Sequence, residues 1–185
     1  MVDIIQKHVI LFSRSFYTRR KSRADSSRRD IDMAIRNIRY NEDPILRKKC
    51  KEVKIIDDKI RQILDDMLET LQETENGAAI AANQVGILKR LVVIDYEDYH
   101  FKLVNPVILE SDGTQECNEA CLSFPNRCVK TIRPQKVTVQ ALNEYGEKIT
   151  ITGEDILAQC FCHELEHLEG EVFLDKAIAE VEIQE

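Results

Sequence analysis

Two histidines and a glutamate near the carboxyl end of the chain have the spacing of a hydrolytic metal site. The segment Cys162–His167 contains the pattern HExxH, with His163, Glu164 and His167 as its fixed positions. Positions i and i+4 of an α-helix lie on one face, so both imidazoles can reach one metal ion. Glu164 would then lie close enough to take a proton from a water molecule at that ion. The pattern favours metal-dependent hydrolysis over a solvated helix face, but it leaves the bond and a third ligand open.

A catalytic site of this type needs three protein ligands, and the third can be Glu, Asp, His or Cys. Glu166 and Glu169 flank the histidine face and do not join it. The cysteines are the stronger candidates, and Cys121 lies in the polar segment Asn118–Pro125, where we expect an active-site loop.

The other cysteines have different expected roles. Cys117 and Cys128 could form a cluster with Cys121, although their spacing fits no CxxC pattern. Cys160 and Cys162 are expected to be packing residues that point away from the two histidines. No secretory signal is evident, so free thiols in a reducing cytoplasm are favoured over disulfide bonds.

Composition indicates one globular domain. The 185 residues are 43% apolar and 32% charged, and the chain is too short for two ordinary domains. A net charge of −7 argues against general binding to nucleic acid or to an anionic membrane. No apolar run approaches the roughly 20 residues that span a bilayer.

The first 32 residues differ from the rest. They carry eight Lys or Arg and four Asp, a net charge of +4, whereas the remainder carries −11. We interpret residues 1–32 as a basic extension that is disordered or not part of the native protein. An organellar targeting peptide is the alternative, but the arginines leave no clean apolar helix face.

Residues 33–185 are predicted to form an α+β domain, because the strand patterns and two separated helices show no βαβ rhythm. The periodicity predicts helices over 57–75 and 156–169, with Gly170 ending the second. Strands are predicted over 90–95, from 101, over 136–142 and over 147–152, with a hairpin turn at 143–146.

Three motifs in order make the chain from about Met33 onward resemble the peptide deformylases. That family has GxGxAAxQ, EGCLS and QHExDH, and this sequence has Gly77–Gln84, Glu119–Ser123 and Cys162–His167 at the corresponding places. Asn41–Leu46 is also similar to the family's opening motif. The resemblance implies antiparallel or mixed sheets around a central helix that carries HExxH.

The resemblance also implies roles for individual residues. Cys121, His163 and His167 would bind one divalent metal ion, Fe²⁺ in the first place, with Zn²⁺, Ni²⁺ or Co²⁺ as substitutes. Glu164 would be the general base and acid. Gln84 and the Leu122 backbone N–H would stabilise the oxyanion. The Gly77–Ile80 segment would pair with the substrate peptide through Gly77, Ala79 and Ile80.

The expected function is removal of the formyl group from N-formylmethionine on newly made polypeptides. The expected partners are these nascent peptides and the ribosome, with no specific nucleic-acid binding, no membrane, a monomeric state and a cytoplasmic location. Ala79 and Ala120 stand where the family has glycine, Cys162 replaces a glutamine, and Glu166 replaces an aspartate. Ala79 and Ala120 motivate one alternative, a related protein that binds metal or peptide with little turnover. A small metallopeptidase is another.

Overall fold

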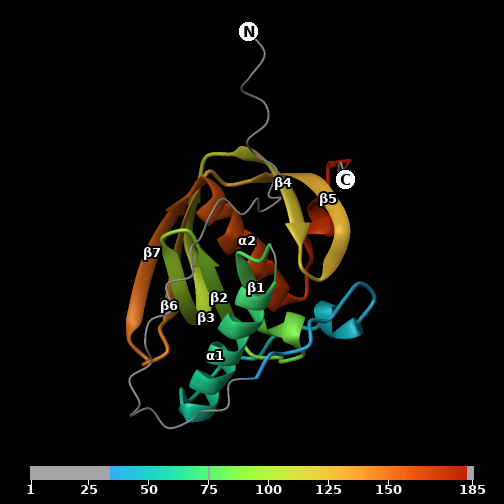
Figure 1. Cartoon of the computed structure of the whole chain (residues 1–185). Helices are drawn as coiled ribbons and strands as arrows, with labels where there is room; N and C mark the ends of the chain where they lie inside the picture. Colours follow the sequence, from blue (N-terminus) through green and yellow to red (C-terminus); the bar gives the residue numbers. More distant parts are fainter. Residues whose placement is uncertain (1–33, 75, 183–185) are drawn as a thin grey trace.

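In the part of the chain that the structure describes, antiparallel strand pairing builds two sheets, which hold two α-helices between and beside them (Figure 1). The computed structural model describes residues 34–74 and 76–182, so the predicted extension 1–32 lies outside the described residues. The larger sheet has the order β1-β2-β3-β6-β7, and the smaller has the order β4-β5-β8. The strands are β1 (Ala79–Ala81), β2 (Leu91–Tyr96), β3 (Tyr99–Asp112), β4 (Gln115–Cys121), β5 (Phe124–Arg133), β6 (Lys136–Leu142), β7 (Lys148–Glu154) and β8 (Ala179–Glu180).

Helix α1 (Asp58–Glu73) forms because its apolar residues recur every three or four positions and its first turn is capped. The Asp57 side chain accepts a hydrogen bond from the Ile60 N–H at 2.9 Å. The buried stripe includes Leu64 and Met67, both fully enclosed. The helix ends at Glu73, slightly before the predicted end at residue 75.

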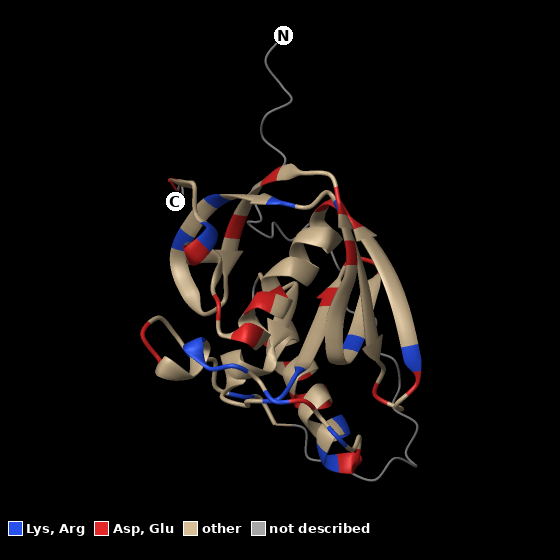
Figure 2. Ribbon diagram, turned by 180° about the vertical axis from the view of Figure 1, so that it is seen from behind, with Lys and Arg blue, Asp and Glu red and all other residues tan. Residues whose placement is uncertain are grey.

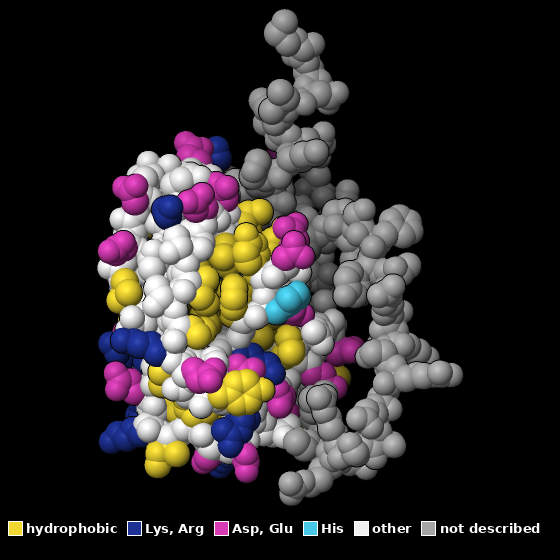
Figure 3. Space-filling view, turned by 90° about the vertical axis from the view of Figure 1, so that its left-hand side faces the viewer, with side chains coloured by type: hydrophobic (Ala, Val, Ile, Leu, Met, Phe, Trp, Pro, Cys, Tyr) yellow, Lys and Arg dark blue, Asp and Glu magenta, His cyan; other side chains and the backbone are white. Residues whose placement is uncertain are grey.

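Strand β1, most of β2 and the middle of β3 are buried on both faces, because a helix covers each side. In β2, Leu91 and Val93 pack into the cluster that contains α1, while Val92 and Ile94 pack into the cluster that contains α2. This two-sided burial explains why the strand has a continuous apolar run. Seen from the side of β7, apolar side chains gather in a band bordered by charged ones (Figure 3).

Helix α2 (Asp155–Glu169) carries the HExxH residues and contacts strands of both sheets, including β1, β6 and β7 of the larger sheet and β5 of the smaller. It is the more carboxyl-terminal of the two α-helices. Figure 2 shows acidic residues gathered on its later turns. Gly170 ends the helix with φ of 79°, and a Cβ there would lie 2.6 Å from the Arg47 carbonyl oxygen. Glycine therefore sets where the helix stops and lets the Arg47 backbone pass close by.

The described residues also form three short 3₁₀-helices: η1 (Pro44–Arg47), η2 (Ala82–Val85) and η3 (Phe173–Lys176). The prediction of an α+β fold with antiparallel sheets and two helices is confirmed. The predicted loop at Asn118–Pro125 is wrong, because these residues form the end of β4, a two-residue turn and the start of β5. Pairing between β4 and β5 supplies the backbone hydrogen bonds that a loop would leave unmade.

No helix in the described ranges is long and apolar enough to span a membrane. All six cysteines lie in the described part of the chain, and all are free thiols.

Candidate metal centre and active site

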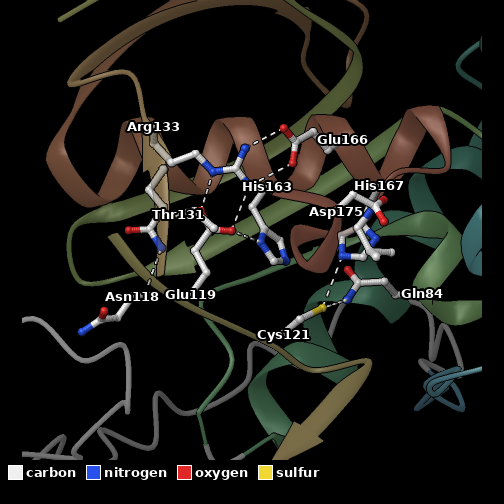
Figure 4. Close-up of polar contacts among 12 residues, drawn as sticks. Gln84, Asn118, Glu119, Cys121, Thr131, Arg133, His163, Glu166, His167 and Asp175 are labelled. Carbon is white, nitrogen blue, oxygen red and sulfur yellow. Dashed lines mark hydrogen bonds and ion pairs between the residues drawn. The ribbon is translucent and has the colours of Figure 1, made fainter. Parts of the chain in front are cut away.

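Cys121, His163 and His167 come together although the cysteine and the first histidine are 42 positions apart in the sequence. Their ligand atoms all lie within 4.8 Å of one another, and Cys121 Sγ is 3.3 Å from His167 Nε2. Zinc bonds of about 2.3 Å to sulfur and 2.1 Å to nitrogen place tetrahedral ligand atoms about 3.5 Å apart. The observed separations therefore fit a single ion. Cys121 reaches this position because it ends β4, beside the face of α2 that carries the histidines (Figure 4).

Glu119 fixes which nitrogen of His163 is free. Burial opposes ionisation of Glu119, but hydrogen bonds from Arg133 and His163 outweigh it and lower the pKa of this carboxyl to about 2. An ionised carboxylate only accepts hydrogen bonds, so the contact of 3.2 Å between His163 Nδ1 and Glu119 Oε2 requires Nδ1 to donate. Burial opposes the charged form of His163, but hydrogen bonds to Cys121 and Glu119 outweigh it and raise the pKa of His163 well above its ordinary value. In the metal-free site Nε2 is therefore protonated as well. A metal ion would replace that proton and bind the Nε2 lone pair.

Arg133 holds Glu119 in place from the opposite side. Its guanidinium donates to both oxygens of Glu119 and to both oxygens of Glu166, and the Thr131 hydroxyl donates to Glu119 at 2.8 Å. Glu119 is fully buried and the Arg133 side chain is 4% exposed. Figure 4 shows this group lying behind His163 as seen from Cys121. The chain thus supports one ligand with a buried ionic network.

His167 is fully buried, and burial together with the nearby charge of His163 lowers its pKa well below the ordinary value. The two rings lie 5.0 Å apart, so they resist carrying two positive charges at once. His167 is therefore neutral, and its Nδ1 has no hydrogen-bond partner among the described residues. A neutral imidazole with one nitrogen facing a cysteine sulfur is suited to metal binding.

Glu164 has the environment of a group that exchanges protons near neutral pH. It is 4% exposed, it faces the cavity, and its Oε2 has no hydrogen-bond partner within residues 34–74 and 76–182. Burial raises its pKa to about 7. A buried carboxyl without a partner is costly unless another group occupies the site, which agrees with a metal or substrate beside it.

Gln84 and Leu122 line the same cavity as Cys121. The Gln84 side-chain amide donates toward Cys121 Sγ at 3.4 Å, and its oxygen accepts from the Ala81 N–H at 2.8 Å. Leu122 follows Cys121 in the turn between β4 and β5, and its side chain packs partly against the α1 cluster. Both residues therefore lie next to Cys121, one of the three candidate ligands.

A cavity of about 320 Å³ opens onto these groups. Its wall includes Gly77 just before β1, Ala79 at the start of β1, Arg127 from β5, and Cys160 from α2. Ile80 was predicted to contact substrate, but its side chain is fully buried in the α1 cluster, so only its backbone is available to a ligand. Strand β1 is at the edge of the larger sheet, with β2 on one side.

The expectation that Cys160 points away from the site is wrong. Cys160 lies three positions before His163 and four before Glu164, so the helical repeat places all three on the cavity wall. Cys162 does pack in the core, in the cluster with Phe161 and Leu168.

The two alanines that replace family glycines cause no backbone strain. Among the described residues, the non-glycine positions with positive φ include neither Ala79 nor Ala120. Both alanines line the cavity, so their methyl groups act on its shape and leave the backbone conformation unaffected.

Sequence reasoning missed the network of Glu119, Thr131 and Arg133. Glu119 was considered only as part of the Glu119–Ser123 motif, and Arg133 was not identified as a site residue. In the strand register Glu119 pairs with Val129 and Cys117 pairs with Thr131, so Glu119, Thr131 and Arg133 lie on the same face of the sheet. Alternation of polar residues along β4 and β5 could therefore have indicated the network.

Comparison with known proteins gives a consistent result. A family model described as polypeptide deformylase matches residues 35–182. Peptide deformylase 2 of Clostridium acetobutylicum is 65% identical over 143 residues, which are 77% of this chain and 95% of that protein. A peptide deformylase structure from Legionella pneumophila has a TM-score of 0.74 and 40% identity, covering 77% of this chain and 86% of that one. One from Thermotoga maritima has a TM-score of 0.75 and 35% identity, covering 77% and 97%.

Proposed function

The chain belongs to the peptide deformylase family, and on that premise we propose that Glu164, Gln84 and Leu122 perform deformylation at a metal ion bound by Cys121, His163 and His167. The enzyme removes the formyl group from the amino terminus of newly made polypeptides, and the family is metal-dependent. The observation that supports the residue assignment most directly is the convergence of the three ligand atoms next to a cavity lined by Gln84 and Glu164.

We propose Fe²⁺ as the native metal, with Zn²⁺, Ni²⁺ or Co²⁺ as substitutes. One thiolate and two imidazoles form a ligand set that accepts several divalent ions. A bound ion would polarise the formyl oxygen and make a water molecule more acidic. His167 is neutral, and His163 donates its Nδ1–H to Glu119. Both observations support metal binding through the ring nitrogens that face Cys121.

Glu164 moves the proton in the proposed reaction. It accepts a proton from the water whose oxygen attacks the formyl carbon, and it delivers that proton to the amine nitrogen as the carbon–nitrogen bond breaks. The products are formate and a free amino terminus. A carboxyl whose pKa is raised to about 7 suits both halves of this transfer at neutral pH.

Gln84 and the Leu122 N–H are the proposed donors to the formyl oxygen, which gains negative charge as the carbon becomes tetrahedral. A donor already aimed at that oxygen needs no reorganisation during the reaction, and removing one typically costs about 3 kcal/mol. The position of the Gln84 amide, 3.4 Å from Cys121 Sγ, supports this role.

The cavity and the edge of β1 form the proposed substrate site. Gly77, Ala79 and the backbone of Ile80 would pair with the peptide as an added strand. The apolar part of the cavity, with Cys160 and Leu122 on its wall, would take the methionine side chain.

Other properties follow as proposals. The helix α2 would serve as the central support of the catalytic domain 33–185, because strands of both sheets contact it. We propose a cytoplasmic monomer that meets nascent peptides at the ribosome, without specific nucleic-acid or membrane binding. Residues 1–32 would be dispensable.

A panel of peptides tests the proposed function. The metal-loaded protein should release formate from formyl-Met-Ala-Ser, and it should leave Met-Ala-Ser with a free amine intact. Cleavage of the free-amine peptide would indicate a peptidase. If formate release is weak, exchanging Ala79 and Ala120 for glycine distinguishes the alternative of a binding protein with little turnover, because a large gain in rate would support that alternative.

A further inference from the structure

The side chain of Gln84 is held in one orientation by contacts that are not part of the proposed reaction. Gln84 is 1% exposed, and its oxygen accepts a hydrogen bond from the Ala81 N–H. A backbone N–H can only donate, so the amide oxygen must face Ala81 and the amide nitrogen must face the other way. The nitrogen lies 3.2 Å from Ser123 Oγ and 3.4 Å from Cys121 Sγ.

The Ser123 hydroxyl oxygen is one of two acceptors near the Gln84 amide nitrogen, and the other is Cys121 Sγ. Ser123 is fully buried in the turn between β4 and β5, two residues after Cys121. An amide nitrogen carries two hydrogens about 120° apart in the amide plane. When one is donated to Ser123 Oγ, the other is directed toward Cys121, where the proposed reaction takes place.

The backbone holds Gln84 and Ser123 at a fixed separation. The Arg39 N–H donates to the Gln84 carbonyl at 2.7 Å, and the Asn41 N–H donates to the Ser123 carbonyl at 2.8 Å. One short segment near the start of the domain therefore bridges η2 and the β4–β5 turn. This leaves the pair of side chains little freedom to rotate or separate.

We propose that Ser123 is a positioning residue that aims the Gln84 amide at the reacting formyl group. This inference rests on the proposed function, because it assigns Ser123 to the same site. Ser123 acts through Gln84 and does not touch the substrate. Without the Ser123 hydroxyl, the Gln84 amide nitrogen loses an acceptor. The amide can then turn away from the formyl oxygen. Misplacement of an oxyanion donor affects the transition state more than the bound substrate.

A purely structural role is the competing explanation, in which the hydroxyl only satisfies a buried turn. The two explanations differ in how Ser123→Ala behaves when Gln84 is absent. A positioning role disappears with the residue that is positioned, whereas a structural role persists.

The test is a double-mutant cycle on formate release from formyl-Met-Ala-Ser by the zinc-loaded full chain. Ser123→Ala should lower kcat about tenfold and change KM less than twofold, since a single neutral hydrogen bond contributes on this scale. Gln84→Ala should lower kcat about 100-fold or more. In the Gln84→Ala background, adding Ser123→Ala should change kcat less than twofold. An equal loss in both backgrounds, or no loss in the wild-type background, would overturn the proposal.

A second readout does not depend on activity. The Gln84 side-chain amide should give an NMR signal that is identified by its disappearance in Gln84→Ala. In Ser123→Ala this signal should shift and its hydrogens should exchange faster with solvent. An unchanged signal would contradict the hydrogen bond. If the wild-type protein released no formate, the proposed function would fail, whereas this signal would still report on the contact between Gln84 and Ser123.

Two further variants control for folding. Ser111→Ala on the exposed part of β3 is a matched change that should alter neither kcat nor the amide signal. If Ser123→Ala does not fold, Ser123→Cys replaces it, because a thiol is a weaker acceptor of similar size and should give a smaller loss of kcat. A Ser123→Cys variant with the full wild-type kcat and an unchanged amide signal would contradict the proposal.

Discussion

Replacing Arg133 with methionine removes the cation that lies between two carboxylates. The Arg133 side chain is 4% exposed, Glu119 is fully buried, and Glu166 is 21% exposed. Without the guanidinium, the Glu119 carboxylate keeps its hydrogen bonds with the Thr131 hydroxyl and with His163 (Figure 4). Removing one member of a buried ion pair typically costs about 3–5 kcal/mol, because the other charge remains buried without compensation.

The expected change in melting temperature follows from chain size. For a domain of about 150 residues, 1 kcal/mol corresponds to roughly 2–4 °C, so Arg133→Met should lower Tm by about 6–20 °C. Thermal unfolding is measured on the metal-free protein, because bound metal would add stability of its own. Arg127→Met is the matched control. The Arg127–Glu180 pair has side chains 46% and 67% exposed, and its loss should cost less than about 1 kcal/mol.

A second substitution separates the effect of the unpaired Glu119 charge on stability from the effect of lost Arg133 packing. Adding Glu119→Gln to Arg133→Met neutralises the charge left behind, so the double variant should lose less stability than the two single changes added together. If Arg133→Met were no more destabilising than Arg127→Met, or if the two changes at Arg133 and Glu119 were additive, the account of a coupled buried network would be refuted.

The remaining predictions concern the metal, the acid stability and the core. Cys121→Ala should weaken metal binding by at least about tenfold while the fold is kept, and an unchanged metal content in elemental analysis would contradict its role as a ligand. Hydrogen bonds led by Gln62 outweigh burial and lower the pKa of Asp66. Asp66→Asn should therefore reduce stability at pH 7, and urea titrations should show the difference from wild type shrinking as pH falls below about 3.9 toward the lowered pKa. Leu64→Ala, in a fully buried position of α1, should cost about 2–5 kcal/mol in chemical denaturation.

Local sequence patterns predicted most of the fold. The helix periodicity placed α1 and α2 to within two residues, and β6 was predicted with its observed bounds, Lys136–Leu142. The smaller sheet was missed, because β4 and β5 have no simple alternation and β8 has two residues. Their stability comes from pairing between segments that are distant in sequence, which a single sequence does not reveal.

The candidate site was predicted through spacing and through resemblance. HExxH indicated His163 and His167 directly, whereas Cys121 needed the second motif to be preferred over the other cysteines. The roles of Glu119 and Ser123 could not be predicted, because they depend on which buried groups face each other after folding. Cys160 was placed wrongly even though the helical repeat puts it on the same face as His163 and Glu164.

The most direct test of the central claim combines turnover with metal content in one variant of Glu164. The Glu164→Gln protein should retain one equivalent of metal and lose at least about 100-fold in the rate of formate release from formyl-Met-Ala-Ser, because the proton acceptor is gone and the ligands remain. Full activity with metal bound would contradict the assignment of Glu164 as the group that moves the proton.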